Sequence, residues 1–128
     1  MSGRSYAFFP RQTLLQEGSS STEYLSESYD IQDAVSMMLE IRPYGVTGTT
    51  PSIAMALQTA NTLHASEADW HEEMGTGGSP ITAGGGTPIR LFGPGSGTFL
   101  GKFARVKVTI TGTDVGITFE ALGLARSE

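Results

Sequence analysis

The sequence predicts an all-β protein, an antiparallel β-sandwich that is jelly-roll-like and has about seven or eight short strands. Short runs in which apolar and polar residues alternate recur along the chain, and clusters of Gly, Pro, Thr and Ser separate them. Strands with a period of two residues, bounded by turn signals, are typical of sandwiches. No long helix or internal repeat is indicated.

The clearest alternation lies at the C-terminal end, in Phe103–Thr111 and Ile117–Leu124, on either side of the Gly-rich stretch Gly112–Gly116. Two alternating runs around such a stretch indicate a hairpin, so the two terminal strands are expected to pair as neighbours. The residues expected to face the core are Ala104, Val106, Val108 and Ile110. Arg105 and Lys107 alternate with them and are expected to face solvent or a partner.

Five further strands are expected in chain order: Arg11–Glu17, Tyr24–Tyr29, Asp33–Arg42, Ser52–Thr59 and Thr87–Phe92. Asp33 could cap a helix, but Pro43 would end that helix within three turns. The Ala content of Ser52–Thr59 would also suit a helix, and its alternation favours a strand. Pro43–Pro51 is expected to be a turn-rich connection between two strands.

The length of 128 residues corresponds to one domain. Residues 1–10 are expected to form an N-terminal arm, and residues 11–128 a single sandwich with a Gly-rich loop near 75–86. Tyr6, Phe8 and Phe9 of the arm are too apolar to lie alone in water, so they are interaction candidates, expected to dock on this domain or on a neighbour. Trp70, within the acidic segment Ala60–Met74, is a fourth candidate; packing against the sheet is its alternative role.

Composition excludes several classes of function. The chain has no cysteine, which rules out disulfides and thiolate chemistry. A net charge of −5 argues against nucleic acid as a partner. No apolar run approaches the roughly 20 residues that span a bilayer, so no membrane partner is expected, and the N-terminal residues do not read as a secretory signal.

No constellation of residues predicts catalysis, a metal site or a cofactor. Gly95–Lys102 lacks the glycine spacing and the Ser or Thr of a phosphate-binding loop. His64 and His71 lie among carboxylates, but without a metal-ligand spacing, so an exposed acidic stretch is the favoured interpretation over a divalent metal site. Paired carboxylates for glycoside hydrolysis stay open, because their separation is set in space.

Three stretches together resemble the small β-sandwich virion proteins of tailed bacteriophages: Val35–Thr59, with its V-T-G-T-T-P-S turn, Thr87–Gly93, and Phe103–Thr113, with R-V-K-V-T-I-T-G-T. The resemblance implies a non-enzymatic capsid decoration (cement) protein that binds and stabilises the outer head surface. It implies the major capsid protein or another virion protein as partner, a homo-oligomer with a trimer favoured, and a place in the virion after synthesis in the host cytoplasm. The aromatic arm would then dock on a neighbouring subunit or on the capsid lattice.

Two other functions stay open. A carbohydrate-binding or adhesive sandwich would need an aromatic platform, for which Trp70, Tyr44 and Tyr24 are the candidates. A small hydrolase or isomerase on a jelly-roll scaffold would need a metal, for which His71 is the candidate ligand.

Overall fold

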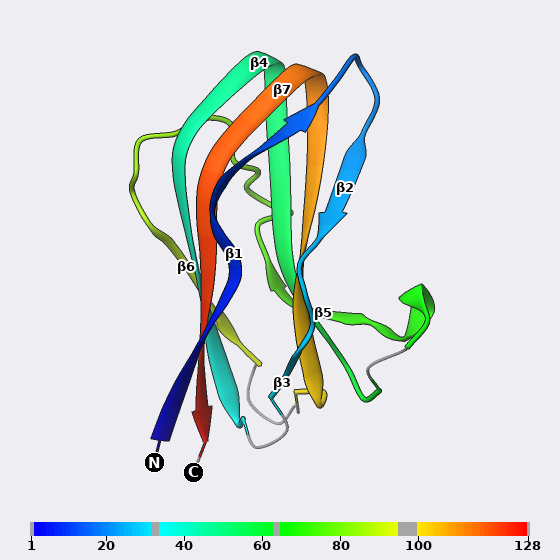
Figure 1. Cartoon of the computed structure of the whole chain (residues 1–128), viewed down its shortest axis with the longest axis vertical. Helices are drawn as coiled ribbons and strands as arrows, with labels where there is room; N and C mark the ends of the chain where they lie inside the picture. Colours follow the sequence, from blue (N-terminus) through cyan, green and yellow to red (C-terminus); the bar gives the residue numbers. More distant parts are fainter. Residues whose placement is uncertain (1, 32–33, 63–64, 95–99, 128) are drawn as a thin grey trace.

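The computed structural model describes residues 2–31, 34–62, 65–94 and 100–127. These residues form an antiparallel sheet of seven strands and one short 3₁₀ helix (Figure 1). The strands are β1 (Ser2–Gln16), β2 (Thr22–Leu25), β3 (Tyr29–Asp30), β4 (Ser36–Ala60), β5 (His71–Gly75), β6 (Ile89–Gly93) and β7 (Phe103–Ser127), and the helix is η1 (Glu67–Asp69). The described part contains no helix that is long and apolar enough to cross a bilayer.

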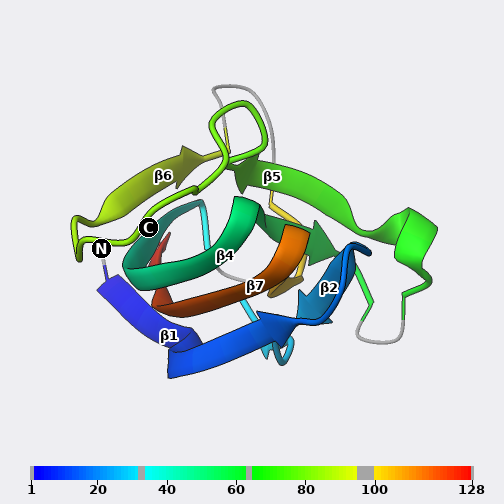
Figure 2. The same ribbon diagram turned by 90° about the horizontal axis from the view of Figure 1, so that it is seen from above.

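The two longest strands, β4 and β7, have 25 residues each and pair with one another from end to end. Both bend in the middle, so each contributes to two sheets that face one another (Figure 2). Sheet I has the order β1, C-terminal half of β7, N-terminal half of β4, β6. In sheet II the order is β2 with β3, N-terminal half of β7, C-terminal half of β4, β5.

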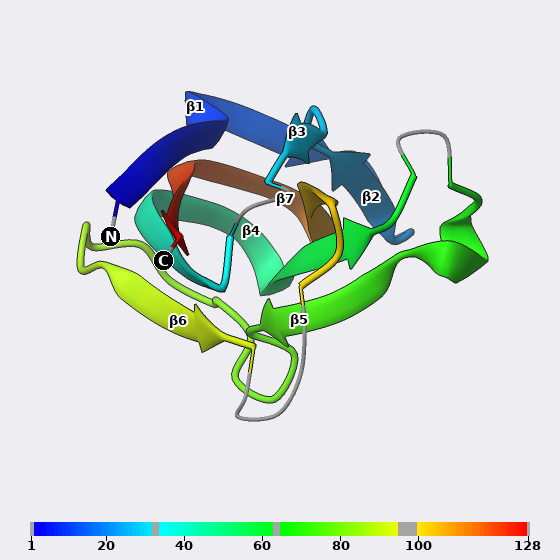
Figure 3. The ribbon, with the colours of Figure 1, turned by 90° about the horizontal axis from the view of Figure 1, so that it is seen from below.

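If the halves of β4 and β7 are counted separately, and β2 with β3 as one interrupted strand, the fold has eight strands in two four-stranded sheets. This is the arrangement of a jelly roll, and it confirms the predicted fold class. The view from below shows the two sheets on opposite sides of a closed sandwich (Figure 3).

The predicted C-terminal hairpin is wrong, because β7 continues through Gly112–Gly116 instead of turning back on itself. Its two halves pair with the two halves of β4 and not with each other. Gly112 (φ 125°) and Asp114 (φ 49°) bend the strand from one sheet to the other, where the register with β4 shifts. Such irregularities commonly turn the corner between two sheets.

The predicted connection Pro43–Pro51 is the matching corner of β4. Gly48 adopts a φ of 113°, and a Cβ built on it would lie 2.7 Å from the carbonyl oxygen of Asp114. Glycine is required there because the two bent strands cross at backbone contact. The two segments predicted on either side of this connection, Asp33–Arg42 and Ser52–Thr59, therefore contribute the two halves of a single strand, which begins at Ser36.

The predicted alternation in the first half of β7 is confirmed. All four side chains expected in the core are fully buried: Ala104, Val106, Val108 and Ile110. They pack with alternate residues of β4, such as Leu39, Ile41, Met55 and Leu57, which are also fully buried. Burial of these aliphatic groups between the sheets is the main favourable contribution to folding.

The predicted N-terminal arm at residues 1–10 is wrong, because residues 2–10 form the first part of strand β1. This strand pairs with β7 from Ser2, opposite Ser127, to Gln16, opposite Val115. Phe8 and Phe9 are only 3% and 6% exposed and belong to the core. Aromatic side chains at a chain end gain burial when the terminus pairs with the open edge of sheet I, so this segment is a strand of the sandwich.

The other expected elements are found with shifted limits. The segment Tyr24–Tyr29 is divided between β2 and β3, and Thr87–Phe92 contains β6. The acidic segment Ala60–Met74, expected as a loop, supplies η1 and most of β5. The Gly-rich loop at 75–86 is held to the sandwich by two backbone hydrogen bonds between Ile81 and Ile53.

Candidate functional site: two outer faces and an end pocket

Three of the four predicted interaction residues are covered within this chain. Phe8 and Phe9 lie in the core, and Trp70 is 8% exposed. Tyr6 is partly buried, packs against Phe8 and Tyr29, and donates a hydrogen bond to the carbonyl oxygen of Asp30. These aromatic side chains stabilise the sandwich, and they do not form a free apolar surface.

Trp70 covers the outer face of sheet II by packing on Arg105. The guanidinium carbon lies 4.1 Å from the centre of the indole ring, which is the geometry of a cation–π contact. The Arg105 side chain also donates hydrogen bonds to Gln58 (2.9 Å) and Glu67 (2.8 Å). Arg105 points to the outer face as expected, but η1 and Trp70 bury it, so it does not face solvent.

The neighbouring cation on this face is also neutralised within the chain. Lys107 forms an ion pair with Glu23 at 3.0 Å, across the pairing of β7 with β2. Hydrogen bonding from Arg105 lowers the pKa of Glu67 below its ordinary value. The two cations of β7 on the outer face of sheet II are therefore held by contacts within the chain, whereas Leu25 of β2 is 46% exposed on the same face.

The outer face of sheet I carries an exposed apolar row. Met38 of β4 pairs with Phe92 of β6 on one side and with Leu124 of β7 on the other. Phe92 is 71% exposed and Leu124 45% exposed. Together with Pro94 they line a shallow hollow of about 390 Å³. We call these residues the Phe92 row; exposed apolar clusters of this kind mark interaction sites more often than isolated apolar residues do.

The outer face of sheet I, on which the Phe92 row lies, is rich in arginine. From the strand alternation and their contacts, the cations on this outer face are Arg11, Arg42, Arg90 and Arg126, and the acids are Glu40 and Glu120. The face therefore carries a formal charge of +2. Because the formal net charge of the whole chain is −5, the residues outside this face carry a net charge of −7. Sheet I thus presents a basic, partly apolar face on an acidic protein.

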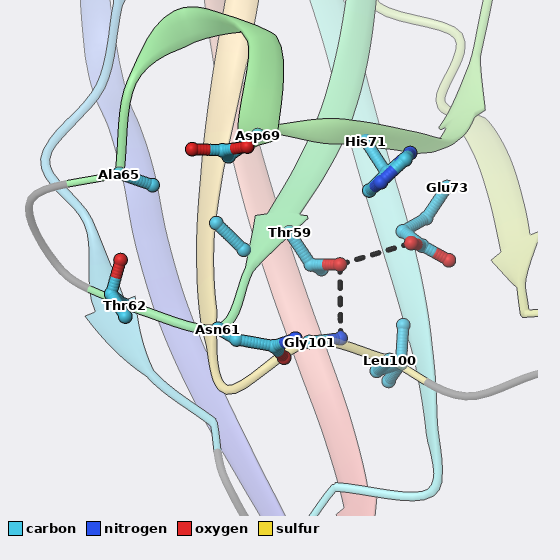
Figure 4. Close-up of a pocket in the computed structure, with 10 residues that line it drawn as sticks. Thr59, Asn61, Thr62, Ala65, Asp69, His71, Glu73, Leu100 and Gly101 are labelled. Atoms are coloured by element: carbon cyan, nitrogen blue, oxygen red, sulfur yellow. Dashed lines mark hydrogen bonds between the residues drawn. The ribbon is translucent and has the colours of Figure 1, made fainter.

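A second hollow, the end pocket, lies at the end of sheet II and has a volume of about 430 Å³ (Figure 4). Its inner wall is built by Thr59, which donates a hydrogen bond to Glu73 and accepts one from the backbone of Gly101. A Cβ on Gly101 would lie 2.8 Å from the backbone nitrogen of Ala60, so only glycine allows this approach. The pocket is also lined by Asn61, Thr62, Ala65, Asp69, His71 and Leu100.

The chemistry of the end pocket is polar and acidic. No three described His, Cys, Asp or Glu side chains are grouped so that they could hold a metal ion, and His64 lies outside the described residues. The described lining residues include no Trp, Tyr or Phe.

No protein-family model and no curated protein matches the sequence. Among solved structures, the chain is similar to VP2 in the subviral particle of infectious bursal disease virus, with a TM-score of 0.56 and 10% identity over 98% of this chain and 33% of that chain. A chain from the Gx strain of the same virus gives a TM-score of 0.61 and 6% identity over 98% of this chain and 32% of that chain. This chain spans about a third of those proteins, and such identities show a shared fold alone.

Sequence reasoning missed the Phe92 row. A signal was present: Met38 lies between the buried Met37 and Leu39, so β4 is apolar on both faces there. The same holds for Leu122 and Leu124 in β7. Only the strand pairing shows that these side chains and Phe92 share one outer face.

Proposed function

We propose that this chain is a non-enzymatic structural protein of a virus particle and, more specifically, a decoration protein on the head of a tailed bacteriophage. It acts by binding the major capsid protein or another virion protein, and it works as a homo-oligomer. The observation that carries the proposal is the outer face of sheet I, which combines the exposed Phe92 row with four arginines. The fold shared with proteins of virus particles supports it.

The physical requirements of a decoration protein fit this molecule. The core is built from two long strands that pair along their whole length, without disulfides. A protein that binds a repetitive lattice gains affinity from many equal contacts, each of which can be weak. One modest docking face per copy is sufficient for such binding.

The test is mass spectrometry of particles purified from the virus or phage whose genome encodes the chain. The expected result is a fixed number of copies per particle. A chain missing from purified particles would contradict the virion assignment altogether.

A deletion of the gene tests the narrower assignment. Heads are expected to assemble without the protein and to lose resistance to heat or low salt, and added purified protein is expected to restore it. Failure of head assembly would instead indicate a shell component, and normal heads with defective tails would indicate a tail protein.

A further inference from the structure

We propose that copies of this chain associate head to tail, with the Phe92 row of one copy seated on the end pocket of the next. This inference rests on the homo-oligomer of the proposed function and deepens it by naming the two surfaces that meet; the particle assay tests the virion and the solution assay below tests the contact. The two surfaces complement one another in shape and charge.

Shape is the first argument. Phe92 is 71% exposed and projects from β6, a strand that pairs only with β4 among the described residues. The end pocket is a hollow of about 430 Å³, and its mostly polar lining includes Ala65 and Leu100 as apolar contacts for a ring. A single aromatic side chain that fills a pocket is the usual anchor of a protein interface.

Charge is the second argument. Arg126 borders the Phe92 row, and Arg90 lies one row further along β6, where it pairs with Glu40 and keeps a side-chain exposure of 58%. Asp69 and Glu73 line the end pocket. A contact between the basic face and the acidic pocket is attractive, whereas two basic faces in contact would repel one another.

The position of the two surfaces is the third argument. The Phe92 row includes Met38, near the first residue of β4, and the end pocket includes Thr59 and Ala60, at the last. Because β4 is bent, both ends lie at the same end of the sandwich but in different sheets (Figure 1). The row and the pocket are different surfaces, so their contact is heterologous, and its repetition between copies closes into a ring or extends as a chain.

The first experiment measures molar mass by light scattering and sedimentation velocity over a range of protein concentrations. The unmodified protein is expected to grow in mass with concentration, less so at high salt because charges contribute. Phe92→Glu and Thr62→Arg, which add the wrong charge to the row and to the pocket rim, are each expected to remain monomeric. Leu15→Glu is the matched control: Leu15 is 59% exposed on β1 opposite Gly116, at the far end of the outer face of sheet I from the Phe92 row, and its variant should associate normally.

Mixing the two variants tests that the contact is heterologous. Phe92→Glu keeps an intact pocket and Thr62→Arg keeps an intact row, so a mixture is expected to form a one-to-one dimer that grows no further. Circular dichroism and melting curves confirm that both variants are folded before the mixture is made.

Three outcomes would overturn the proposal. The first is an unmodified protein that stays monomeric at every concentration. The second is a Phe92→Glu variant that associates as strongly as the unmodified protein, or a Leu15→Glu variant that loses association as completely as Phe92→Glu does. The third is a mixture of the folded variants that contains monomers only, since this would show that the pocket is not the receptor for the row.

Discussion

On the outer face of sheet II, the side chain of Arg105 is 8% exposed and is held by Trp70, Gln58 and Glu67. On the outer face of sheet I, the side chain of Arg90 is 58% exposed, and its one ion pair lies beside the uncovered Phe92 row. Both arginines project from a β-strand of the same sandwich. They differ because a segment between β4 and β5 folds over sheet II, and no described segment folds over sheet I (Figure 3).

The comparison identifies which face is available to a partner. A buried cation with aromatic and carboxylate contacts contributes to folding, so its face is already used within the chain. An exposed aromatic beside exposed cations gains little within the chain and much more on contact with another surface. The order of effects below follows from this difference.

The largest effect is expected from deletion of residues 2–10, the first nine residues of the edge strand β1 of sheet I. The deletion removes the buried Phe8 and Phe9 and exposes the edge of β7 that pairs with β1. Loss of two core aromatics costs about 3–5 kcal/mol each, which exceeds much of the stability of a small domain. The truncated protein should lack a cooperative thermal transition, and a truncation that melts like the full chain would refute the role of β1 in the core.

The second effect tests the core that both faces share. Val108→Asp places an unpaired charge between the sheets, where the side chain is fully buried, and should cost about 4 kcal/mol or prevent folding. Thr109→Asp, one residue further along β7 and directed outward, is the matched control and should cost less than about 1 kcal/mol. Equal denaturation midpoints for the two variants would show that the alternation of β7 is misassigned.

The sequence predicted the strands and the core-facing side of β7 because alternation is a local property. It could not distinguish a hairpin from a corner at Gly112–Gly116, since both need residues with positive φ. The difference lies in β4, about 60 residues earlier in the chain, whose own corner at Gly48 matches that of β7. Strand partners, and therefore topology, are fixed by such long-range pairing.

The candidate site was harder to predict for a related reason. Three aromatics near the N-terminus indicated an arm that docks on this domain or on a neighbour, because sequence does not show the free edge of β7 that buries them. The same reasoning overlooked Phe92, whose neighbours in space come from β4 and β7. Only the packing of Trp70 against the sheet, one of the two alternatives weighed for it, is confirmed.

The third effect compares the two faces directly, because the same change from arginine to alanine is made on each face. Arg105→Ala removes a buried guanidinium with two hydrogen bonds and a ring contact, and should cost about 2 kcal/mol. Arg90→Ala removes an exposed ion pair and should cost less than about 1 kcal/mol. Urea denaturation measures both; a larger loss for Arg90→Ala would reverse the assignment of the closed and open faces.

The smallest effect is a difference in pH dependence between the two faces. Hydrogen bonding from Arg105 lowers the pKa of Glu67 from 4.5, so this contact to sheet II is fully present above pH 4.5 and is lost as the pH falls through the lower pKa of the folded state. A hydrogen bond to Glu120 raises the pKa of Tyr44 from 10.0, so this contact on sheet I is present below pH 10.0 and is lost as the pH rises further.

Emission of Trp70, the only tryptophan, should report an acid transition that Glu67→Gln abolishes and Tyr44→Phe leaves intact. Ultraviolet absorbance at alkaline pH follows all four tyrosines, and Tyr44→Phe should remove one component of that titration, which lies above pH 10.0. An acid change of Trp70 emission that persists in Glu67→Gln would show that Glu67 does not hold the cover of sheet II.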